Sequence, residues 1–500
     1  MTDGRSLARN AAFNVAGLVI PLLLAVAVIP PLVRGFGAER FGILTLAWAA
    51  IGYFSLFDAG LGRALTQSVA RRSGTASAAD IASVAWTTML VLVALGIVAA
   101  ILVIGLTPFV VARLSLAPAL SGEARITFFM LAATLPLVLS TGGLRGLLEA
   151  HHDFGIVNAI RIPMAAATFV GPLLVLPFSR SLVPAVATLV AARIVGWVVH
   201  VIACLRRYPW LRQHAAMRAR EVLPLLRFGG WATVTNVVGP LLVYMDRFVI
   251  GAVLSVVAVT YYVTPYEVVT KLMIVPGAVL TAMFPAFAAT FESNPSRMAT
   301  LYDRSQRMVL LIVFPLVLPM VALAREGLQL WMGGVLPPES AVVLQWLGIG
   351  VFVNAMAHAP YSALQGAGRP DLVAKVHLAE LPLYVVALWL LLQRFGIVGV
   401  AMAWTFRSAV DTVALLWLRR RRLTLDLPGG AVHARLVVGL LSVLAIAMVL
   451  PGTLSRALYV AGVGILFLFT TSRRLLTSSE RAAVVEWIRT RRVSRAHGVS

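Results

Sequence analysis

The sequence predicts an all-α polytopic membrane protein with about 14 transmembrane helices, arranged as two six-helix lobes and two further helices. Three observations support this fold class. Of the 500 residues, 60% are hydrophobic and 12% are charged, which departs from the composition of soluble globular domains. Apolar runs of 18 or more residues recur along the whole chain, as repeated transmembrane helices require. Segments of the first half also recur in the second half, in the same order.

The apolar windows give the predicted elements in chain order. The N-terminal lobe, 1–205, holds spans near 11–34, 41–70, 81–106, 125–149, 156–178 and 183–205. A polar cytoplasmic linker, 206–222, separates it from the C-terminal lobe, 223–420, whose spans lie near 223–253, 258–288, 305–325, 341–365, 374–393 and 397–418. Two weaker spans, near 435–451 and 456–471, occupy the segment 421–472 and precede a basic cytoplasmic tail, 473–500.

Internal repeats relate the two predicted lobes. RSLARNAAFNVAG at 5–17 aligns with RFGGWATVTNVVG at 227–239, which places Asn14 over Asn236. Near the end of each lobe, ARIVGWVVHVIACLRR aligns with FRSAVDTVALLWLRRR. Because each repeat has six spans, an even number, the lobes are predicted to be parallel repeats about an axis along the membrane normal. Such lobes leave a central cavity between them.

The distribution of basic residues sets the predicted orientation. The formal net charge of +22 would by itself be compatible with nucleic-acid binding. The basic residues, however, cluster in short loops on alternate sides of the spans, and about two thirds of the 42 Lys and Arg fall on the side of the two termini. We therefore predict that both termini are cytoplasmic, and we expect no nucleic-acid partner.

Motifs of soluble enzymes and cofactor sites find no supporting context in this chain. The single cysteine, Cys204, excludes an intrachain disulfide. His151, His152 and Asp153 lie between two spans without a further ligand at metal spacing, which favours a turn over a zinc site. The chain also lacks a Walker A motif. We expect no enzymatic activity, no catalytic residues, no metal site and no bound cofactor.

Charged residues within the predicted spans are the candidate functional residues. Asp58 and Arg63 lie in the second span, although each costs at least about 2.5 kcal/mol near the bilayer centre. Glu267 and Lys271 in the eighth span are four residues apart, which places them on one helix face with the acid first. Pro265 and Pro276 flank this pair and predict a kinked helix. Charges of this kind face the bundle interior or a wet cavity rather than lipid.

Two further positions complete this set of charges. Asp246 and Arg247 lie in the seventh span, and Glu380 lies in the eleventh. Arg63 and Lys271 are interpreted as cations that line the cavity. For the acids two interpretations stay open: they line the cavity, or they form structural pairs that lock helices together. Glu380 is either a proton carrier or a buried neutral acid.

Short motifs give the sequence a resemblance to a known family. They are Gly37-x-x-x-Phe41-Gly42, then Phe57-Asp58-x-Gly60-Leu61, YMDRFVIGAVL at 244–254 and LQGAGRPDLVAK at 364–375. Together they resemble the polysaccharide-biosynthesis flippases of the multidrug/oligosaccharidyl-lipid/polysaccharide exporter superfamily. The likeness extends over about residues 5 to 420, and the last two spans match the family mainly in number.

The resemblance implies a transporter that works by alternating access. Its substrate would be a polyprenyl-diphosphate-linked oligosaccharide, moved from the inner to the outer leaflet of a bacterial cytoplasmic membrane for surface polysaccharide synthesis. Carried onto this chain, the substrate cavity would include Arg63, Arg247, Lys271, Asn14 and Asn236. A proton or sodium gradient would act through Asp58, Asp246, Glu267 or Glu380. Expected partners are the lipid-linked glycan, membrane lipids, and polysaccharide polymerase and chain-length proteins.

Competing interpretations come from the same fold and from other classes. A multidrug and toxin extrusion antiporter handles organic cations, which a basic cavity disfavours. A lipid II flippase shares the anionic lipid diphosphate and differs in its headgroup. A membrane glycan polymerase or ligase typically carries a large outer loop, whereas the longest predicted outer loop here, about 107–124, is short. A non-transporting scaffold leaves the charges within the spans unexplained.

Overall fold

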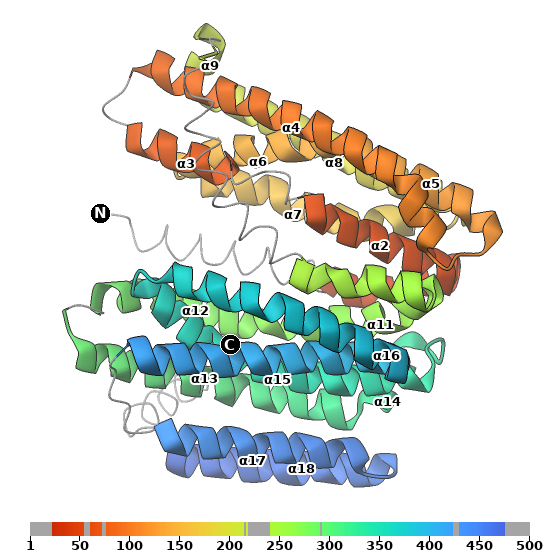
Figure 1. Ribbon diagram of the computed structural model, residues 1–500, viewed down its shortest axis with the longest axis vertical. Helices are drawn as coiled ribbons and strands as arrows, with labels where there is room; N and C mark the ends of the chain where they lie inside the picture. Colours follow the sequence, from red (N-terminus) through yellow and green to blue (C-terminus); the bar gives the residue numbers. More distant parts are fainter. Residues whose placement is uncertain are drawn as a thin grey trace, which may run out of the picture. The chain divides into compact units, whose positions relative to one another are not determined.

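The computed structural model describes residues 23–54, 61–72, 77–214, 217–218, 241–290, 293–423 and 430–475. These residues form helices joined by short connections, and no strand occurs among them (Figure 1). Within the described part, nine helices are long and apolar enough to cross a membrane. The predicted all-α polytopic fold class is confirmed. The count of 14 spans and the boundaries of the two lobes, the linker and the tail stay predictions.

The first half of the chain contributes a helix at Leu23–Phe36 and eight further helices that follow it. They are α2 (Ala38–Phe54), α3 (Leu61–Arg72), α4 (Ala78–Arg113), α5 (Pro118–Ala133), α6 (Leu135–Ala150), α7 (Phe154–Val175), α8 (Leu182–Arg207) and the short α9 (Trp210–Gln213). The predicted span 125–149 is therefore two helices. The break falls at Thr134, directly before the Leu135-Pro136 pair, because proline has no N–H to donate to the helix hydrogen bonds. The Thr134 hydroxyl donates to the Leu131 carbonyl at this break.

The second half begins, within the described residues, with a helix at 241–253. It continues with α11 (Val256–Val269), a 3₁₀ turn (Thr270–Met273), α12 (Ile274–Thr290), α13 (Pro295–Ala322), α14 (Ala324–Met332), α15 (Pro338–Gly366), α16 (Pro370–Arg422), α17 (Gly430–Val449) and α18 (Thr453–Thr470), with a π turn at Thr471–Leu475. The predicted spans 374–393 and 397–418 form the two parts of α16. They meet at Gly396, whose φ of 57° interrupts the helical backbone and favours glycine.

The described chain divides into two compact units. The first unit contains Met1–Lys271, Trp331–Val343 and His377–Ala403, and the second contains Leu272–Leu330, Leu344–Val376 and Trp404–Ser500. Each unit therefore combines segments that lie far apart in the sequence.

Glu123 joins three helices of the first unit at one point. Its carboxylate accepts hydrogen bonds from the Arg40 guanidinium of α2, at 3.0 Å, and from the hydroxyl of Ser181, at 2.5 Å, and the backbone N–H of Leu182 at the start of α8. Because one partly buried carboxylate serves three donors, it fixes how α2, α5 and α8 meet.

A close approach of α2 and α11 occurs at Gly42. A Cβ at this position would lie 2.1 Å from the carbonyl oxygen of Val256, so only glycine allows the contact. The Thr260 hydroxyl donates to the Ala38 carbonyl at 2.5 Å beside it. The packing explains why the Phe41-Gly42 pair belongs to a motif: the glycine brings a helix of the second half against α2.

The first half of the predicted polar linker is packed against the first unit. Tyr208 and Leu211 are buried, and the Tyr208 hydroxyl donates to Asp153 at 2.6 Å. The indole N–H of Trp86 in α4 donates to the carbonyl of Leu211 at 3.0 Å. Aromatic side chains therefore anchor this segment, although its charge pattern indicated a solvated link.

The second unit is held by hydrogen bonds and aromatic packing between its helices. Thr405 of α16 donates to the carbonyl of Trp346 of α15 at 2.7 Å. Phe314 of α13 packs against Phe352 of α15 and Phe467 of α18, with ring centroids 5.9 and 4.8 Å apart. The hairpin of α17 and α18 is thus part of this unit.

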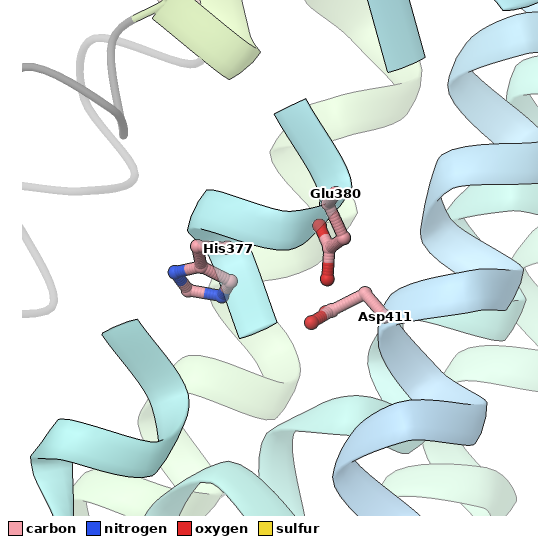
Figure 2. A group of neighbouring side chains, drawn as sticks. All are labelled: His377, Glu380 and Asp411. Carbon is pink, nitrogen blue, oxygen red and sulfur yellow. The ribbon is translucent and has the colours of Figure 1, made fainter. Parts of the chain in front are cut away.

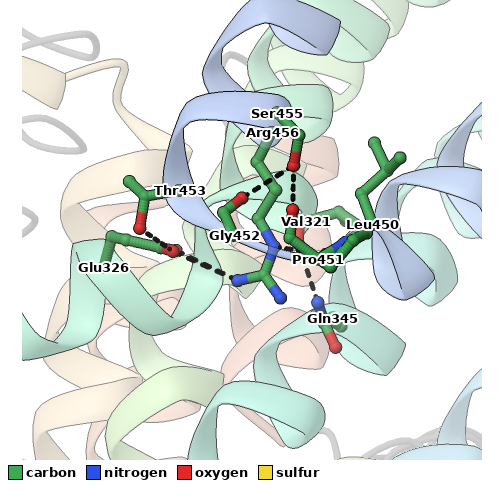
Figure 3. A network of polar contacts seen from close by, with 9 residues as sticks. All are labelled: Val321, Glu326, Gln345, Leu450, Pro451, Gly452, Thr453, Ser455 and Arg456. Atoms are coloured by element: carbon green, nitrogen blue, oxygen red, sulfur yellow. Dashed lines mark hydrogen bonds and ion pairs between the residues drawn. The ribbon is translucent and has the colours of Figure 1, made fainter.

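A polar latch, formed by Glu326, Thr453 and Arg456, fastens the α17–α18 hairpin to α14 (Figure 3). The Glu326 carboxylate accepts from the Thr453 hydroxyl at 3.0 Å and from the Arg456 guanidinium at 3.1 Å. Arg456 also donates to the Leu450 carbonyl in the connection between α17 and α18, at 2.8 Å. Burial alone raises the pKa of Glu326, but its own backbone N–H, Thr453 and Arg456 outweigh burial and hold this pKa below 4.5.

The latch predicts a pH-dependent contribution to stability. Because folding lowers the pKa of Glu326, its contribution is fully present above about pH 4.5 and is lost as the pH falls through the folded-state pKa. We expect Glu326→Gln to lower the free energy of unfolding by up to about 1 kcal/mol at pH 7, since the pair is partly exposed. The difference in the free energy of unfolding between wild type and variant, measured in detergent, should be smaller at pH 4 than at pH 7. A gap that stays constant with pH would contradict this role.

Candidate functional site

The charged residues predicted in the seventh and eighth spans lie together in the first unit. The helix at 241–253 carries Asp246 and Arg247, and α11 with the 3₁₀ turn after it carries Glu267 and Lys271. We refer to these four residues as the charge cluster.

Asp246 is fully buried and is held by two hydrogen bonds. Its carboxylate accepts from the Tyr262 hydroxyl of α11 at 2.6 Å and from the backbone N–H of Arg247 at 2.8 Å. Both Asp246 and Tyr262 are 0% exposed. A buried carboxylate needs such donors because desolvation is otherwise costly. Asp246 therefore acts as a tie between the helix at 241–253 and α11.

Arg247, Glu267 and Lys271 form a chain of ion pairs. The Arg247 Nη2 lies 2.9 Å from Glu267 Oε1, and the Lys271 Nζ lies 3.0 Å from Glu267 Oε2. The predicted pairing of Glu267 with Lys271 is confirmed. The side chain of Arg247 is 3% exposed, whereas that of Lys271 is 33% exposed. The exposed fraction of the side chains thus rises from Arg247 to Lys271, and Lys271 is the accessible end of this series of ion pairs.

Two tyrosines surround the buried guanidinium. The Arg247 Cζ lies 5.2 Å from the ring centroid of Tyr244 and 5.0 Å from that of Tyr266. Aromatic faces attract a cation and pack against its planar group. Arg247 is therefore enclosed by two rings and one carboxylate, which suits a structural cation better than a freely accessible one.

Lys271 projects from a local change of helix type. It lies in the 3₁₀ turn Thr270–Met273, between Pro265 and Pro276, and the division between the two compact units falls directly after it. A short 3₁₀ stretch inside a longer helix often marks a hinge. The sequence predicted a kinked eighth helix; the structure shows a change of helix type between the two prolines, and the kink itself stays a prediction.

Glu380 lies on the first part of α16, and His377 lies one turn before it on the same helix (Figure 2). Asp411, which is also drawn, belongs to the second part of α16 beyond Gly396. Glu380 is 2% exposed, and Tyr384, one turn after it, is 1% exposed. This part of α16 thus carries a buried acid, and the choice between a proton carrier and a buried neutral acid stays open.

Several predicted site residues fall outside the described part. Asn14, Asp58 and Asn236 lie outside the described residues. Arg63 is the third residue of α3, and its side chain also lies outside the described part. Their proposed roles stay predictions.

The sequence analysis missed the aromatic residues that complete the cluster. Tyr262 and Tyr266 are one helical turn apart, and Tyr266 directly precedes Glu267. Their rings lie 5.8 Å apart, with Tyr262 bonded to Asp246 and Tyr266 beside Arg247. The run YYVTPYE could have indicated them, because buried tyrosines need a hydrogen-bond partner and the seventh span offers one.

Comparison with known proteins places this geometry among membrane transporters. Residues 7–291 match the sequence family described as polysaccharide biosynthesis protein. The chain is 31% identical over 422 residues to a putative O-antigen transporter of Shigella flexneri, a match that covers 83% of this chain and 98% of that protein. A probable low-salt glycan biosynthesis flippase, Agl15 of Haloferax volcanii, is 24% identical over 190 residues, which cover 38% of this chain and 40% of that protein.

Solved structures share the fold at low sequence identity. An inward-facing multidrug resistance MATE family transporter of the MOP superfamily matches with a TM-score of 0.71 and 16% identity, over 81% of this chain and 97% of that one. The lipid II flippase MurJ in an inward closed conformation also has a TM-score of 0.71, with 10% identity over 94% of this chain and 100% of that one.

The charge cluster predicts unequal costs for removing its members. Glu267→Gln leaves the buried Arg247 without its carboxylate, so we expect it to lower the free energy of unfolding by about 3 kcal/mol or more. Lys271→Met removes a partly exposed charge and should cost less than about 1 kcal/mol. Unfolding of both variants in detergent, followed by circular dichroism, measures the difference. Equal losses would contradict the assignment of Arg247 as the buried member and Lys271 as the accessible one.

Proposed function

The chain belongs to the family of polysaccharide biosynthesis proteins, and we propose on this premise that it is a flippase for lipid-linked oligosaccharides. The observation that carries the proposal is its similarity to the putative O-antigen transporter, which extends over 98% of that protein's length. The similarity to a glycan biosynthesis flippase supports the same function.

The fold by itself does not select the substrate. A multidrug transporter and the lipid II flippase match this chain with the same TM-score. The family match and the curated relatives favour a glycan carrier. The accessible end of the charge cluster is also a cation, Lys271, which suits an anionic substrate better than an organic cation.

We propose further that the substrate is a polyprenyl-diphosphate-linked glycan, moved from the inner to the outer leaflet of a bacterial cytoplasmic membrane. The excess of Lys and Arg on the side of the termini supports a cytoplasmic position for both ends. The products would feed surface polysaccharide synthesis, with polymerase and chain-length proteins as partners. Chemistry on the glycan would then belong to those partners, since this chain's relatives are transporters.

Within the charge cluster, Lys271 is the proposed contact to the diphosphate. An ammonium group binds phosphate as a point charge, and its flexible stem allows it to follow a moving group. Arg247 and Glu267 would hold Lys271 in place rather than meet the substrate, because both are nearly enclosed. Arg63, Asn14 and Asn236 remain proposed cavity residues on the sequence argument alone.

The 3₁₀ turn that carries Lys271 is the proposed moving element of alternating access. It lies between Pro265 and Pro276, so a change of helix type there would move Lys271. For coupling to a proton or sodium gradient, each carboxylate oxygen of Glu267 already contacts a cation, and Asp246 is engaged by Tyr262. Glu380 and Asp58 stay candidate acids for ion coupling on the sequence pattern alone.

Lipid flipping in proteoliposomes tests this function. A polyprenyl-diphosphate oligosaccharide would be incorporated, and its accessibility to an external glycan-modifying enzyme would be followed over time. We expect rapid flipping by the wild type and a loss of about tenfold or more in Lys271→Ala and in Arg63→Ala, since each removes a charge-assisted contact.

The control is Lys375→Ala, which removes an exposed lysine on α16 that pairs with Asp371 at 3.7 Å. Absence of flipping by folded wild type with several lipid-linked glycans would overturn the proposed function. Flipping that persists in both variants would instead make Lys271 and Arg63 structural residues.

A further inference from the structure

A basic cavity of about 400 Å³ lies inside the first unit, away from the charge cluster. It is lined by residues of α2, α6, α7 and α8, and most of these residues are apolar. Its basic groups are Arg145, Arg161, Arg193 and His200, and none of the described residues that line it is a carboxylate. We refer to it as the basic pocket.

The three arginines of the basic pocket differ in their partners. Arg145 pairs with Glu149 of the same helix at 3.4 Å. Arg193 donates to the Thr134 hydroxyl at 3.3 Å, and no carboxylate contacts it within the described part of the chain. Arg161 is exposed and has no hydrogen-bond or ion-pair partner among the described residues. Two guanidinium charges in the pocket are therefore not neutralised.

The basic groups extend inward from one end of the helices. α6 ends at Ala150, α7 begins at Phe154, and the Asp153–Tyr208 hydrogen bond brings the end of α8 to the same place. Arg145 and Arg161 lie about 8–11 Å along their helices from this end, and Arg193 lies about 21 Å from it. The pocket therefore offers positive charge from the depth of a lipid headgroup down to mid-membrane.

The composition of the wall selects between the parts of a glycolipid. Thr141 and Thr168 are the uncharged hydroxyl groups of the described lining, and no Asn, Gln, Asp or Glu occurs among the described lining residues to bind sugar hydroxyls. Val138, Leu139 and Met164 provide apolar surface beside the arginines. Guanidinium groups next to aliphatic side chains fit a phosphate attached to a hydrocarbon chain better than they fit an uncharged oligosaccharide.

We propose that the basic pocket binds the diphosphate and first isoprenoid units of a polyprenyl diphosphate, the part that lipid-linked glycans share. The proposal rests on the proposed function and adds a second anion site to it, on α6, α7 and α8. A diphosphate that joins two organic groups carries two negative charges, which match the two unneutralised guanidinium groups. An ordinary phosphodiester lipid carries one. Arg161 receives the diphosphate at the mouth, and Arg193 binds it deeper in the pocket.

Binding of glycan-free undecaprenyl diphosphate to the full chain in phosphatidylcholine nanodiscs tests the pocket; this probe carries the two phosphoryl groups of the proposal and one further ionisable hydroxyl in place of the glycan. We expect Arg161→Gln and Arg193→Gln each to weaken binding about tenfold or more, because each removes a charge-assisted, bidentate contact. The matched control is Arg125→Gln on α5, an exposed arginine outside the pocket, which should leave the affinity unchanged. Among the described residues Arg161 has no hydrogen-bond or ion-pair partner to lose, so its variant should fold even where Arg193→Gln does not.

Three outcomes decide the proposal. Unchanged affinity in Arg161→Gln overturns it, as does an equal loss in Arg125→Gln. Displacement of the probe by an equimolar amount of phosphatidylglycerol would make the pocket a site for ordinary anionic phospholipid. A flipping assay on the wild type separates this inference from the proposed function. Binding that depends on Arg161 without any flipping would support the pocket and reject the function. Flipping together with binding that does not depend on Arg161 would support the function and reject the pocket.

Discussion

The pairing of Arg247 with Glu267 is the interaction on which the candidate site depends. A guanidinium that is 3% exposed among apolar helices is stable when a carboxylate, and here two aromatic rings, replace its water. The pair holds the helix at 241–253 against α11, and the Asp246–Tyr262 bond adds a second tie between the same helices. Glu267 then has one oxygen left for Lys271, which stands at the edge of the cluster. The buried Arg247–Glu267 pair thus holds Lys271 at the exposed edge of the cluster.

Local patterns in the sequence predicted the parts of the site that belong to one helix. The spacing of Glu267 and Lys271 predicted their contact, and the flanking prolines enclose the 3₁₀ turn in which Lys271 lies. The contact of Arg247 with Glu267 joins two helices, and the sequence contained no measure of how those helices face each other. Tyr262 was overlooked for the same reason, because its partner Asp246 lies on the neighbouring helix.

The fold was predictable where hydropathy alone decides, and less so where packing does. The apolar windows located α7 and α8 to within three residues at both ends, whereas α4 ends seven residues after its window and α13 begins ten residues before its window. The break before Pro136 was visible in the sequence but lay within one apolar run, so hydropathy joined α5 and α6. The burial of Tyr208 in a basic segment depends on Asp153, a tertiary partner that charge patterning does not reveal. The basic pocket required the same kind of information, since its arginines come from three helices.

The central claim is that Arg247 and Glu267 are enclosed and leave Lys271 accessible to a water-filled path. Thiol labelling tests it most directly, because Cys204 is the single native cysteine and is buried. In a Cys204→Ala background, the labelling rate of Lys271→Cys by a hydrophilic maleimide would be compared with that of Thr264→Cys, a fully buried position on α11. The account predicts labelling at 271 at least about tenfold faster, with protection by lipid-linked glycan, because the reagent needs a hydrated thiolate. Equal and negligible labelling at both positions would show that Lys271 meets no water, and would contradict the account.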